Sequence, residues 1–247
     1  MHDAPTRNEA LALVARGVSL NETARRTGVQ RSTIRAWMSA PEPVPRECFR
    51  CLGLHPAAAR AYTALLGFYL GDGCVSRFRR HTTLRISCDA TLPGIIADVS
   101  SLVAAVRPSG GAFHVRAPGV IVVSANWKHW PCLFPQHGPG RKHERTIALE
   151  TWQREVVEAH PADFLRGLFH SDGCRARNWA TRVVAGERRR YDYPRWQFTN
   201  RSDDIRDLCC WALDLVDVPW RRSGRWVVSV SRREAVGRLD ALIGPKT

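Results

Sequence analysis

The chain has 247 residues and 44% of them are hydrophobic, enough to bury a core, which excludes a disordered chain. Lysine and arginine number 37 against 23 acidic residues, and the resulting net charge of +14 favours a polyanionic partner such as nucleic acid. No apolar stretch is long enough to span a membrane and the polar start carries no secretory signal, so we expect a cytoplasmic protein with reduced thiols.

Arginine supplies nearly all of the positive charge, and only Lys128, Lys142 and Lys246 are lysines. A guanidinium group forks onto phosphate oxygens and onto guanine, so this bias fits contact with DNA. A genome rich in G and C would produce the same bias. The composition therefore favours a nucleic-acid partner without identifying it.

Residues 7 to 39 predict three short helices. The first has an apolar face between Arg7 and Arg16 and ends at Gly17. Ser19, followed three residues later by Glu22, is typical of a capping box that opens a second helix, which ends at Thr27 before a turn at Gly28. A third helix is expected from Arg31 to about Ser39, before a run of prolines that forbids further helix.

The spacing of small and apolar residues in this segment resembles a helix-turn-helix, which we assign to residues 1 to 40. The exposed face of the third helix then offers side chains that read base edges and hold phosphates. The candidate DNA-binding residues are Arg31, Ser32, Thr33 and Arg35. The alternative is a three-helix oligomerisation module with a solvated basic face.

Residues 41 to 56 hold four prolines and predict a linker. Within it, Cys48 and Cys51 have the spacing of a metal-binding pair, but a four-ligand zinc site needs a second pair. His55, or His129 with Cys132, could supply ligands, and nothing in the sequence selects between them. The sequence alone favours two reduced thiols in a connector over a zinc site.

An internal repeat dominates the rest of the chain. Residues 65–74, Leu-Leu-Gly-Phe-Tyr-Leu-Gly-Asp-Gly-Cys, match residues 165–174, Leu-Arg-Gly-Leu-Phe-His-Ser-Asp-Gly-Cys, at an offset of 100. In each copy two small residues lie four apart: Gly67 and Gly71, then Gly167 and Ser171. That spacing lets two helix backbones approach closely, so we expect the repeated helices to pack on each other at a pseudo-twofold axis.

Asp72 and Asp172 fall in the last turn of these helices. A carboxylate there opposes the helix dipole, and two side by side repel each other, so the arrangement does not favour the fold. It becomes sensible if a divalent cation binds beside the carboxylates. The alternative is that Asp-Gly is simply a common helix-ending turn. In either case we expect Gly73 and Gly173, where the helices end, in the left-handed conformation.

Similar elements follow each copy. Strand-like residues 83–87 and 195–199 come first, then helical segments 90–106 and 202–216, then strands 120–124 and 226–230. The order is duplicated within one chain. We therefore divide the remaining sequence into halves at residues 57 to 150 and 151 to 247, and expect a monomer with internal pseudo-twofold symmetry.

The two motifs resemble the LAGLIDADG (dodecapeptide) family of homing endonucleases over roughly residues 57 to 247. The resemblance implies an α+β fold in which each half is αββαββα and two saddle-shaped antiparallel sheets lie in the major groove of double-stranded DNA. It also implies that Asp72 and Asp172 are the catalytic, metal-binding acids, with Mg²⁺ or Mn²⁺ as cofactor. The carbonyl groups of Gly71 and Ser171 are then minor metal contacts.

The family also has a basic residue near each metal site. Aligning the late strands places Lys128 opposite Arg233, and we take these as the candidates that polarise water or stabilise charge on the phosphate. The motif position that is often acidic in the family is Leu70 in one copy and His170 in the other. His170 could move a proton, but a packed helix histidine is the favoured interpretation.

The saddle is expected to carry the DNA contacts of both halves. The candidates are Arg77, Arg79, Arg85, Arg175, Arg177, Arg195 and Gln197. The leading hypothesis is a metal-dependent, site-specific double-stranded DNA endonuclease of the homing type. The alternative is a transcription regulator that keeps the scaffold and has lost cleavage, although such a protein has no reason to retain both carboxylates.

Overall fold

The computed structural model describes residues 4–39, 48–79, 81–107 and 110–247. The chain divides into two compact units, Met1–Arg46 and Glu47–Thr247. Of the linker expected over residues 41 to 56, residues 41 to 47 lie outside the described part of the chain. Residues 48 to 54 form turns closed by main-chain hydrogen bonds from Leu52 to Cys48 and from Leu54 to Phe49.

The first unit has the expected three helices, α1 (Ala4–Ala15), α2 (Leu20–Thr27) and α3 (Arg31–Ser39). Ser19 caps α2 by accepting a hydrogen bond from the main-chain N–H of Glu22 at 3.2 Å. Gly28 ends α2 with φ of 67°, a conformation that favours glycine, and so makes the turn into α3. Ala10, Val29 and Ile34 form a small buried core. Whether this unit binds DNA stays a prediction.

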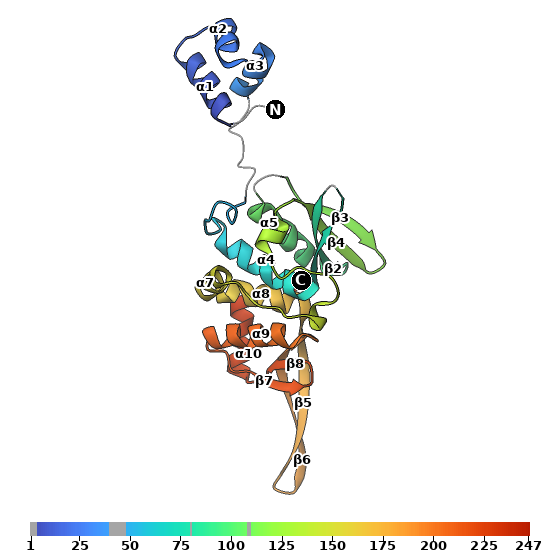
Figure 1. Ribbon diagram of the computed structural model, residues 1–247. Helices are drawn as coiled ribbons and strands as arrows, with labels where there is room; N and C mark the ends of the chain where they lie inside the picture. Colours follow the sequence, from blue (N-terminus) through green and yellow to red (C-terminus); the bar gives the residue numbers. More distant parts are fainter. Residues whose placement is uncertain (1–3, 40–47, 80, 108–109) are drawn as a thin grey trace. The chain divides into compact units, whose positions relative to one another are not determined.

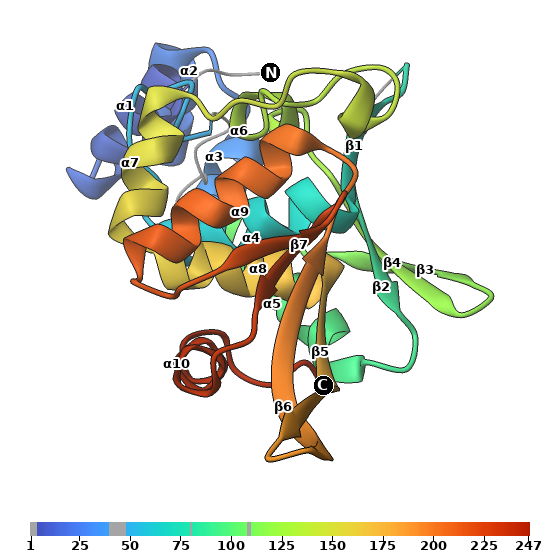
Figure 2. The same cartoon turned by 90° about the horizontal axis from the view of Figure 1, so that it is seen from below.

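The second unit contains the duplicated pattern, and α4 and α8 lie side by side in both views (Figures 1 and 2). The first copy comprises α4 (Ala59–Asp72), β1 (Gly73–Arg77), β2 (Thr82–Asp89), α5 (Pro93–Val106), β3 (Phe113–Ala117), β4 (Val120–Asn126) and α6 (Trp130–Leu133). The second comprises α8 (Pro161–Asp172), β5 (Gly173–Val184), β6 (Glu187–Thr199), α9 (Asp203–Leu215), β7 (Arg221–Gly224), β8 (Val227–Val230) and α10 (Arg233–Ile243). A short 3-10 helix (Lys142–Glu144) and α7 (Thr151–Ala159) connect the copies.

Each copy builds one antiparallel four-stranded sheet, in the orders β1-β2-β4-β3 and β5-β6-β8-β7. The mixed α+β class and the αββαββα order of each half are therefore as expected. Along β2 the side chains of Leu84, Ile86 and Cys88 are buried, whereas Arg85 and Ser87 are exposed, because successive residues of a strand point to opposite faces. Each sheet thus has one face on the core and one face open.

The hairpin of β5 and β6 is long and extends away from the rest of the second unit (Figure 1). Its turn is formed by Ala185 and Gly186, whose φ angles of 52° and 83° match the right-handed twist of the two strands. The arginine-rich residues 187 to 190 are the first residues of β6 and directly follow this turn. No helix within the described residues is both long and apolar enough to cross a membrane.

The packing of α4 on α8 requires the small residues that the sequence repeats. A Cβ on Gly67 would lie 2.4 Å from the carbonyl oxygen of Phe164, and one on Gly167 would lie 2.1 Å from that of Ala64. Gly67 and Gly167 are equivalent positions of the repeat, and so are Ala64 and Phe164. The two contacts are therefore equivalent, as expected for two helices related by a local twofold axis. The predicted close approach is confirmed.

The expected left-handed conformation of Gly73 and Gly173 is wrong. Both residues are extended, with φ of −96° and −93°, and each is already the first residue of a strand. Glycine is needed there for space, because a Cβ on Gly73 would lie 2.5 Å from the Cα of Tyr69, and one on Gly173 2.3 Å from the carbonyl oxygen of Phe169. In each copy of the repeat, the chain therefore passes directly from helix to strand without an intervening loop.

Candidate active site

Asp72 and Asp172 are the last residues of α4 and α8. The close helix contact brings these two ends together. A Cβ on Gly71 would lie 2.0 Å from Ser171 Oγ and 3.3 Å from Asp172 Oδ2, so the carboxyl group of one helix reaches the last turn of the other. Two carboxyl groups 100 residues apart in the sequence therefore share one site.

Burial and mutual repulsion shift the proton affinity of this pair. Burial, followed by the charge of Asp72, raises the pKa of Asp172 to about 6, against a hydrogen bond of 2.6 Å donated by Asn200 Nδ2 to Asp172 Oδ2. The Asp72 side chain is more exposed, yet partial burial still raises its pKa, and the two nearby lysines oppose that rise. The fold thus disfavours the charged form of both carboxyl groups.

Lys142 and Lys246 are those lysines. Lys142 Nζ donates to four main-chain oxygens at 2.6–2.9 Å, those of Tyr69, Leu70, Gly71 and Gly73. Lys246 Nζ donates to the main-chain oxygens of Ser171 at 2.9 Å and Gly173 at 2.8 Å. Each ammonium group therefore binds the unpaired carbonyl groups at the end of one motif helix, where the charges of both aspartates act on it.

Burial lowers the pKa of both ammonium groups, to about 8 for Lys142, while the two aspartates oppose the shift. A lysine with a lowered pKa exchanges its proton more readily near neutral pH than an exposed lysine does. The site thus holds, near the two carboxylates, two basic groups that give up a proton more readily than an exposed lysine does.

The basic residues expected from strand alignment lie elsewhere. Lys128 is exposed in the turn after β4, and Arg233 is exposed at the first position of α10. Neither is among the charges that shift these two pKa values. Those charges are Lys142 and Lys246 for both aspartates and, for Asp172, also Asp72. The missed signal is that each of the two lysines follows a Gly-Pro pair, at residues 138–142 and 244–246.

The main-chain oxygens of Gly71 and Ser171 were expected as minor metal contacts, and in this structure each accepts a hydrogen bond from a lysine. A carbonyl oxygen has a second lone pair, so the bond does not remove its capacity to contact a cation. Two neighbouring carboxyl groups, both with a raised pKa, form an all-oxygen donor set together with the carbonyl oxygens. Such a set fits Mg²⁺ or Mn²⁺.

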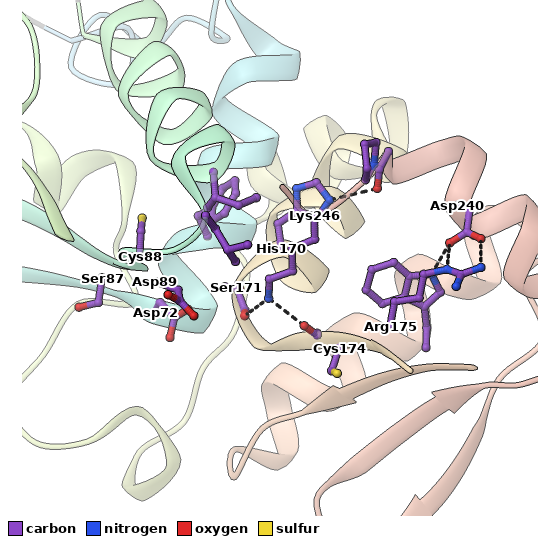
Figure 3. Close-up of a pocket in the computed structure, with 17 residues that line it drawn as sticks. Asp72, Ser87, Cys88, Asp89, His170, Ser171, Cys174, Arg175, Asp240 and Lys246 are labelled. Carbon is purple, nitrogen blue, oxygen red and sulfur yellow. Dashed lines mark hydrogen bonds and ion pairs between the residues drawn. The ribbon is translucent and has the colours of Figure 1, made fainter. Parts of the chain in front are cut away.

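A pocket of about 830 Å³ opens beside this site and is lined by Asp72, Ser171, Lys246 and Asp240 of α10 (Figure 3). His170 also lines it, but its ring is buried, contacts Phe68 and lies with Nε2 3.3 Å from the carbonyl oxygen of Gly244. Burial lowers the pKa of His170, so the neutral form prevails. This environment agrees with the packed histidine favoured from the sequence.

The predicted DNA contacts divide between the two faces of the sheets. Arg85, Arg195 and Gln197 alternate with the buried residues Ile86, Trp196 and Phe198, so they lie on the open face. Arg195 donates to Ser229 and Ser223 on the neighbouring strands of that face.

Arg175 shares the core-side face with Trp196, its partner across the β5–β6 ladder. Its guanidinium donates two hydrogen bonds of 2.8 Å to the carboxylate of Asp240 of α10 (Figure 3). The structure therefore places Arg175 in an intramolecular ion pair and not on the saddle. Arg77 and Arg177 have the same strand parity as Arg175 and, like it, are exposed. Arg79 is exposed just beyond β1.

In the first unit, α3 exposes Arg31, Ser32 and Arg35, whereas Thr33 is partly buried. Arg31 donates to the side-chain oxygen of Asn21 in α2 at 2.8 Å. The three exposed residues are neighbours on the surface of this short helix, and Ile34 is buried in the core of the unit. Their arrangement is compatible with the predicted reading face.

No protein-family model and no curated relative matches the sequence. Among solved structures, mesophilic variants of the homing endonuclease I-DmoI align with a TM-score of 0.48 and 10% identity, covering 76% of this chain and 97% of theirs. The LAGLIDADG meganuclease I-AabMI bound to uncleaved DNA aligns with a TM-score of 0.45 and 14% identity, covering 73% and 82%. The I-SmaMI LAGLIDADG homing endonuclease bound to cleaved DNA aligns with a TM-score of 0.47 and 9% identity, covering 74% of this chain and 83% of that chain. These three proteins are described as homing endonucleases or meganucleases, two of them as LAGLIDADG proteins, and the likeness to them is one of fold.

Proposed function

We propose that this protein is a divalent-metal-dependent endonuclease that cuts double-stranded DNA at a specific site, in the manner of a homing endonuclease. One observation carries the proposal: two carboxylates from duplicated helices share a site, and each has a lysine bound to the end of its own helix. The fold does not gain stability from that arrangement, so its retention fits a role in chemistry.

Asp72 and Asp172 would hold the cation together with the carbonyl oxygens of Gly71 and Ser171. A bound divalent ion supplies an activated water and neutralises charge on the scissile phosphate. Lys142 and Lys246 bind the ends of the two motif helices, where both aspartates act on each of them. They would orient water by hydrogen bonding or donate a proton to a leaving oxygen. Because the site is duplicated, each half would serve the cut of one strand.

The open faces of the two sheets would contact the DNA. Arg85 in the first half and Arg195 with Gln197 in the second are the residues there that can bind phosphates or base edges. The long β5–β6 hairpin adds further arginines, at positions 182, 188, 189 and 190. The helix-turn-helix unit would add a second contact to the same DNA.

The test uses the full-length protein and a supercoiled plasmid that carries the genomic DNA around its own gene, with and without Mg²⁺. Conversion to nicked or linear plasmid reports cleavage, and fluorescence anisotropy in Ca²⁺ reports binding. Asp72→Asn and Asp172→Asn are each expected to lower double-strand cleavage by at least about a hundredfold, leaving nicked plasmid, with binding retained.

Asp217→Asn is the matched control, because Asp217 is a carboxylate on the loop after α9, and asparagine tolerates its φ of 49°. It is expected to cut as well as wild type. If the wild-type protein binds this DNA tightly in Mg²⁺ and neither nicks nor breaks it, the nuclease proposal is wrong and the regulator interpretation replaces it.

A further inference from the structure

A second cluster of metal-ligating side chains lies outside the nuclease site. Cys48 and Cys51, which precede α4, meet His129 and Cys132, at the start of α6. The four donor atoms all lie within 4.8 Å of one another. The pairs are about 80 residues apart in the sequence, so tertiary structure and not local spacing brings them together.

The separations match a tetrahedral site. Zinc bonds of about 2.3 Å to sulfur and 2.0–2.1 Å to nitrogen imply edges of about 3.8 Å between sulfurs and about 3.6 Å between sulfur and nitrogen. The observed Sγ–Sγ distances are 3.4 Å for Cys48–Cys51 and 3.8 Å for Cys51–Cys132. Nδ1 of His129 lies 3.3 Å from Cys51 Sγ and 3.9 Å from Cys132 Sγ. These sulfur distances are well beyond a disulfide bond.

Both ligand pairs lie on short turns that fix their direction. The main-chain N–H of Cys51 donates to Cys48 Sγ at 3.4 Å, a bond that stabilises a thiolate. In the other pair, the main-chain N–H of Cys132 donates to the carbonyl oxygen of His129 at 2.9 Å. Cys48 and His129 are buried, whereas Cys51 reaches the surface and leaves an entry path for an ion.

The turns are anchored on the core of the second unit. Phe49, between the two cysteines, packs against Tyr62 of α4 and Trp152 of α7, with ring centroids 5.8 Å apart in both contacts. Trp130, next to His129, is fully buried and donates its indole N–H to Ala125 of β4. The ligands are therefore held by packing in the arrangement that a metal needs.

We propose that Cys48, Cys51, His129 and Cys132 bind one structural Zn²⁺. On binding, the ion displaces the protons of the three thiols, so the closed Cys3His site carries a net charge of −1 and leaves no position for substrate. Oxygen ligands, which Mg²⁺ requires, are absent from this described cluster, so the site is chemically separate from the paired aspartates.

The position of the site indicates its role. It joins the first described segment of the second unit to α6, across the start of α4 and the end of β4. A zinc crosslink would hold that segment against the body of the first half when the helix-turn-helix unit and the sheets bind DNA together. It would also stabilise the fold, because a structural metal binds the native state and not the unfolded chain.

The experiment measures metal content of the full-length protein, expressed with zinc and purified without chelator. Mass spectrometry of the elements is expected to give about one zinc per chain. Protein stripped and refilled with Co²⁺ is expected to show the intense visible bands of tetrahedral cobalt and a thiolate charge-transfer band in the near ultraviolet. Chelation of the zinc is expected to lower the melting temperature, and Zn²⁺ addition under reducing conditions to restore it.

Three variants locate the site. Cys51→Ser is expected to lose the zinc, and Cys132→His to retain it with a weaker charge-transfer band, because histidine replaces one thiolate. Cys174→Ser, which alters an exposed cysteine of the second motif, keeps its zinc, as does the double variant Asp72→Asn/Asp172→Asn. The last variant separates this site from the nuclease site.

The wild-type measurements decide the proposal even if a variant fails to fold. A native protein with less than a tenth of a zinc per chain after incubation with Zn²⁺ and reductant, and no cobalt charge-transfer band, overturns it. Detection of a Cys48–Cys51 disulfide in freshly purified protein, or full zinc content in folded Cys51→Ser, also overturns it. Loss of cleavage with zinc still bound would instead concern the proposed nuclease.

Discussion

Lys142 and Lys246 occupy equivalent places in the two halves: Lys142 Nζ donates to the main-chain oxygen of Gly71 at 2.6 Å, and Lys246 Nζ to that of Ser171 at 2.9 Å. Gly71 and Ser171 are the residues immediately before the two aspartates. The lysines therefore share the twofold relationship of the carboxylates, although they come from segments of unlike structure, a 3-10 helix and the residues after α10.

The first prediction concerns these lysines. Lys142→Met and Lys246→Met each remove a buried ammonium group while keeping most of the side-chain volume. We expect each to slow cleavage by about 10²- to 10⁴-fold, the usual contribution of a positioned proton donor or acceptor. Single-turnover cleavage of a plasmid that carries the target measures the loss, with binding followed separately in Ca²⁺.

Lys128→Met tests the strand alignment against the geometry. Because Lys128 is exposed and is not among the charges acting on either aspartate, we expect its cleavage rate to stay within about twofold of wild type. A large loss in Lys128→Met together with normal cutting by both buried-lysine variants contradicts the assignment. Loss of binding in Lys142→Met or Lys246→Met would point to a structural role instead.

The second prediction concerns stability and pH in metal-free protein. The folded-state pKa of Asp172, about 6, is above its ordinary value, so the native state binds this proton more tightly than the unfolded chain does. The resulting stabilisation is complete below about pH 4 and is lost as the pH rises through about 6. Asp172→Asn stays neutral throughout, so it is expected to match wild type near pH 4 and to exceed it by about 1–2 kcal/mol near pH 8.

Urea unfolding followed by circular dichroism between pH 4 and pH 8 measures the difference. Asp217→Asn is the control, because it removes a carboxylate that lies outside the paired site, on the loop after α9. If Asp172→Asn is less stable than wild type at pH 8, the Asn200 hydrogen bond outweighs burial and repulsion, and the electrostatic account of the pair is wrong.

The sequence predicts the parts of this site that repeat in register. Asp72 with Asp172, and Gly67 with Gly167, recur at one offset on helices of fixed period, so their meeting follows from helix geometry. Lys142 and Lys246 lie 70 and 74 residues after their aspartates, on connections of different length. Alignment of the strands selected Lys128 because it compares only residues in or next to the sheets. Lys142 and Lys246 lie on connections outside the sheets, so that alignment could not pair them.

The partners of Cys48 and Cys51, and the sheet face on which Arg175 lies, also could not be predicted from local sequence pattern. His129 and Cys132 were one of several candidate pairs for Cys48 and Cys51, and only the packing of Phe49 and Trp130 selects them. Arg175 was grouped with the other arginines of its strand, but strand parity puts it opposite Asp240. Local pattern predicts the elements well, whereas partners distant in the sequence depend on how the elements pack.

The third prediction concerns the helix interface. Gly167→Ala would place a Cβ 2.1 Å from the main-chain oxygen of Ala64, so α4 and α8 must separate, at a cost of about 1–3 kcal/mol or more. Separation also moves the carboxylates apart, so cleavage should fall together with stability. Urea unfolding and plasmid cleavage of the same preparation measure the two effects.

Gly237→Ala is the matched control, because Gly237 is also in a helix and an added Cβ there would have open space. Alanine restricts the unfolded chain and favours helix, so this variant is expected to gain roughly 0.5–1 kcal/mol. If Gly167→Ala is as stable as Gly237→Ala, the contact between α4 and α8 does not depend on small residues, and the account of the interface is wrong.

The fourth prediction separates the two faces of the sheets. Arg85→Ala removes a charge from the open face, so we expect weaker binding to all DNA sequences and a salt dependence reduced by about one counterion. Arg175→Ala breaks the ion pair with Asp240, whose carboxylate also accepts from the indole of Trp196, so it is expected to lower stability and leave DNA affinity within about twofold.

Affinities measured by anisotropy at several salt concentrations, together with melting temperatures, distinguish the two variants because each is predicted to move one quantity and not the other. An Arg175→Ala variant that binds DNA much more weakly while melting like wild type would mean that Asp240 releases the guanidinium to DNA. In that case the pocket beside the carboxylates is part of the DNA path, and the saddle extends to the core-side edge of β5.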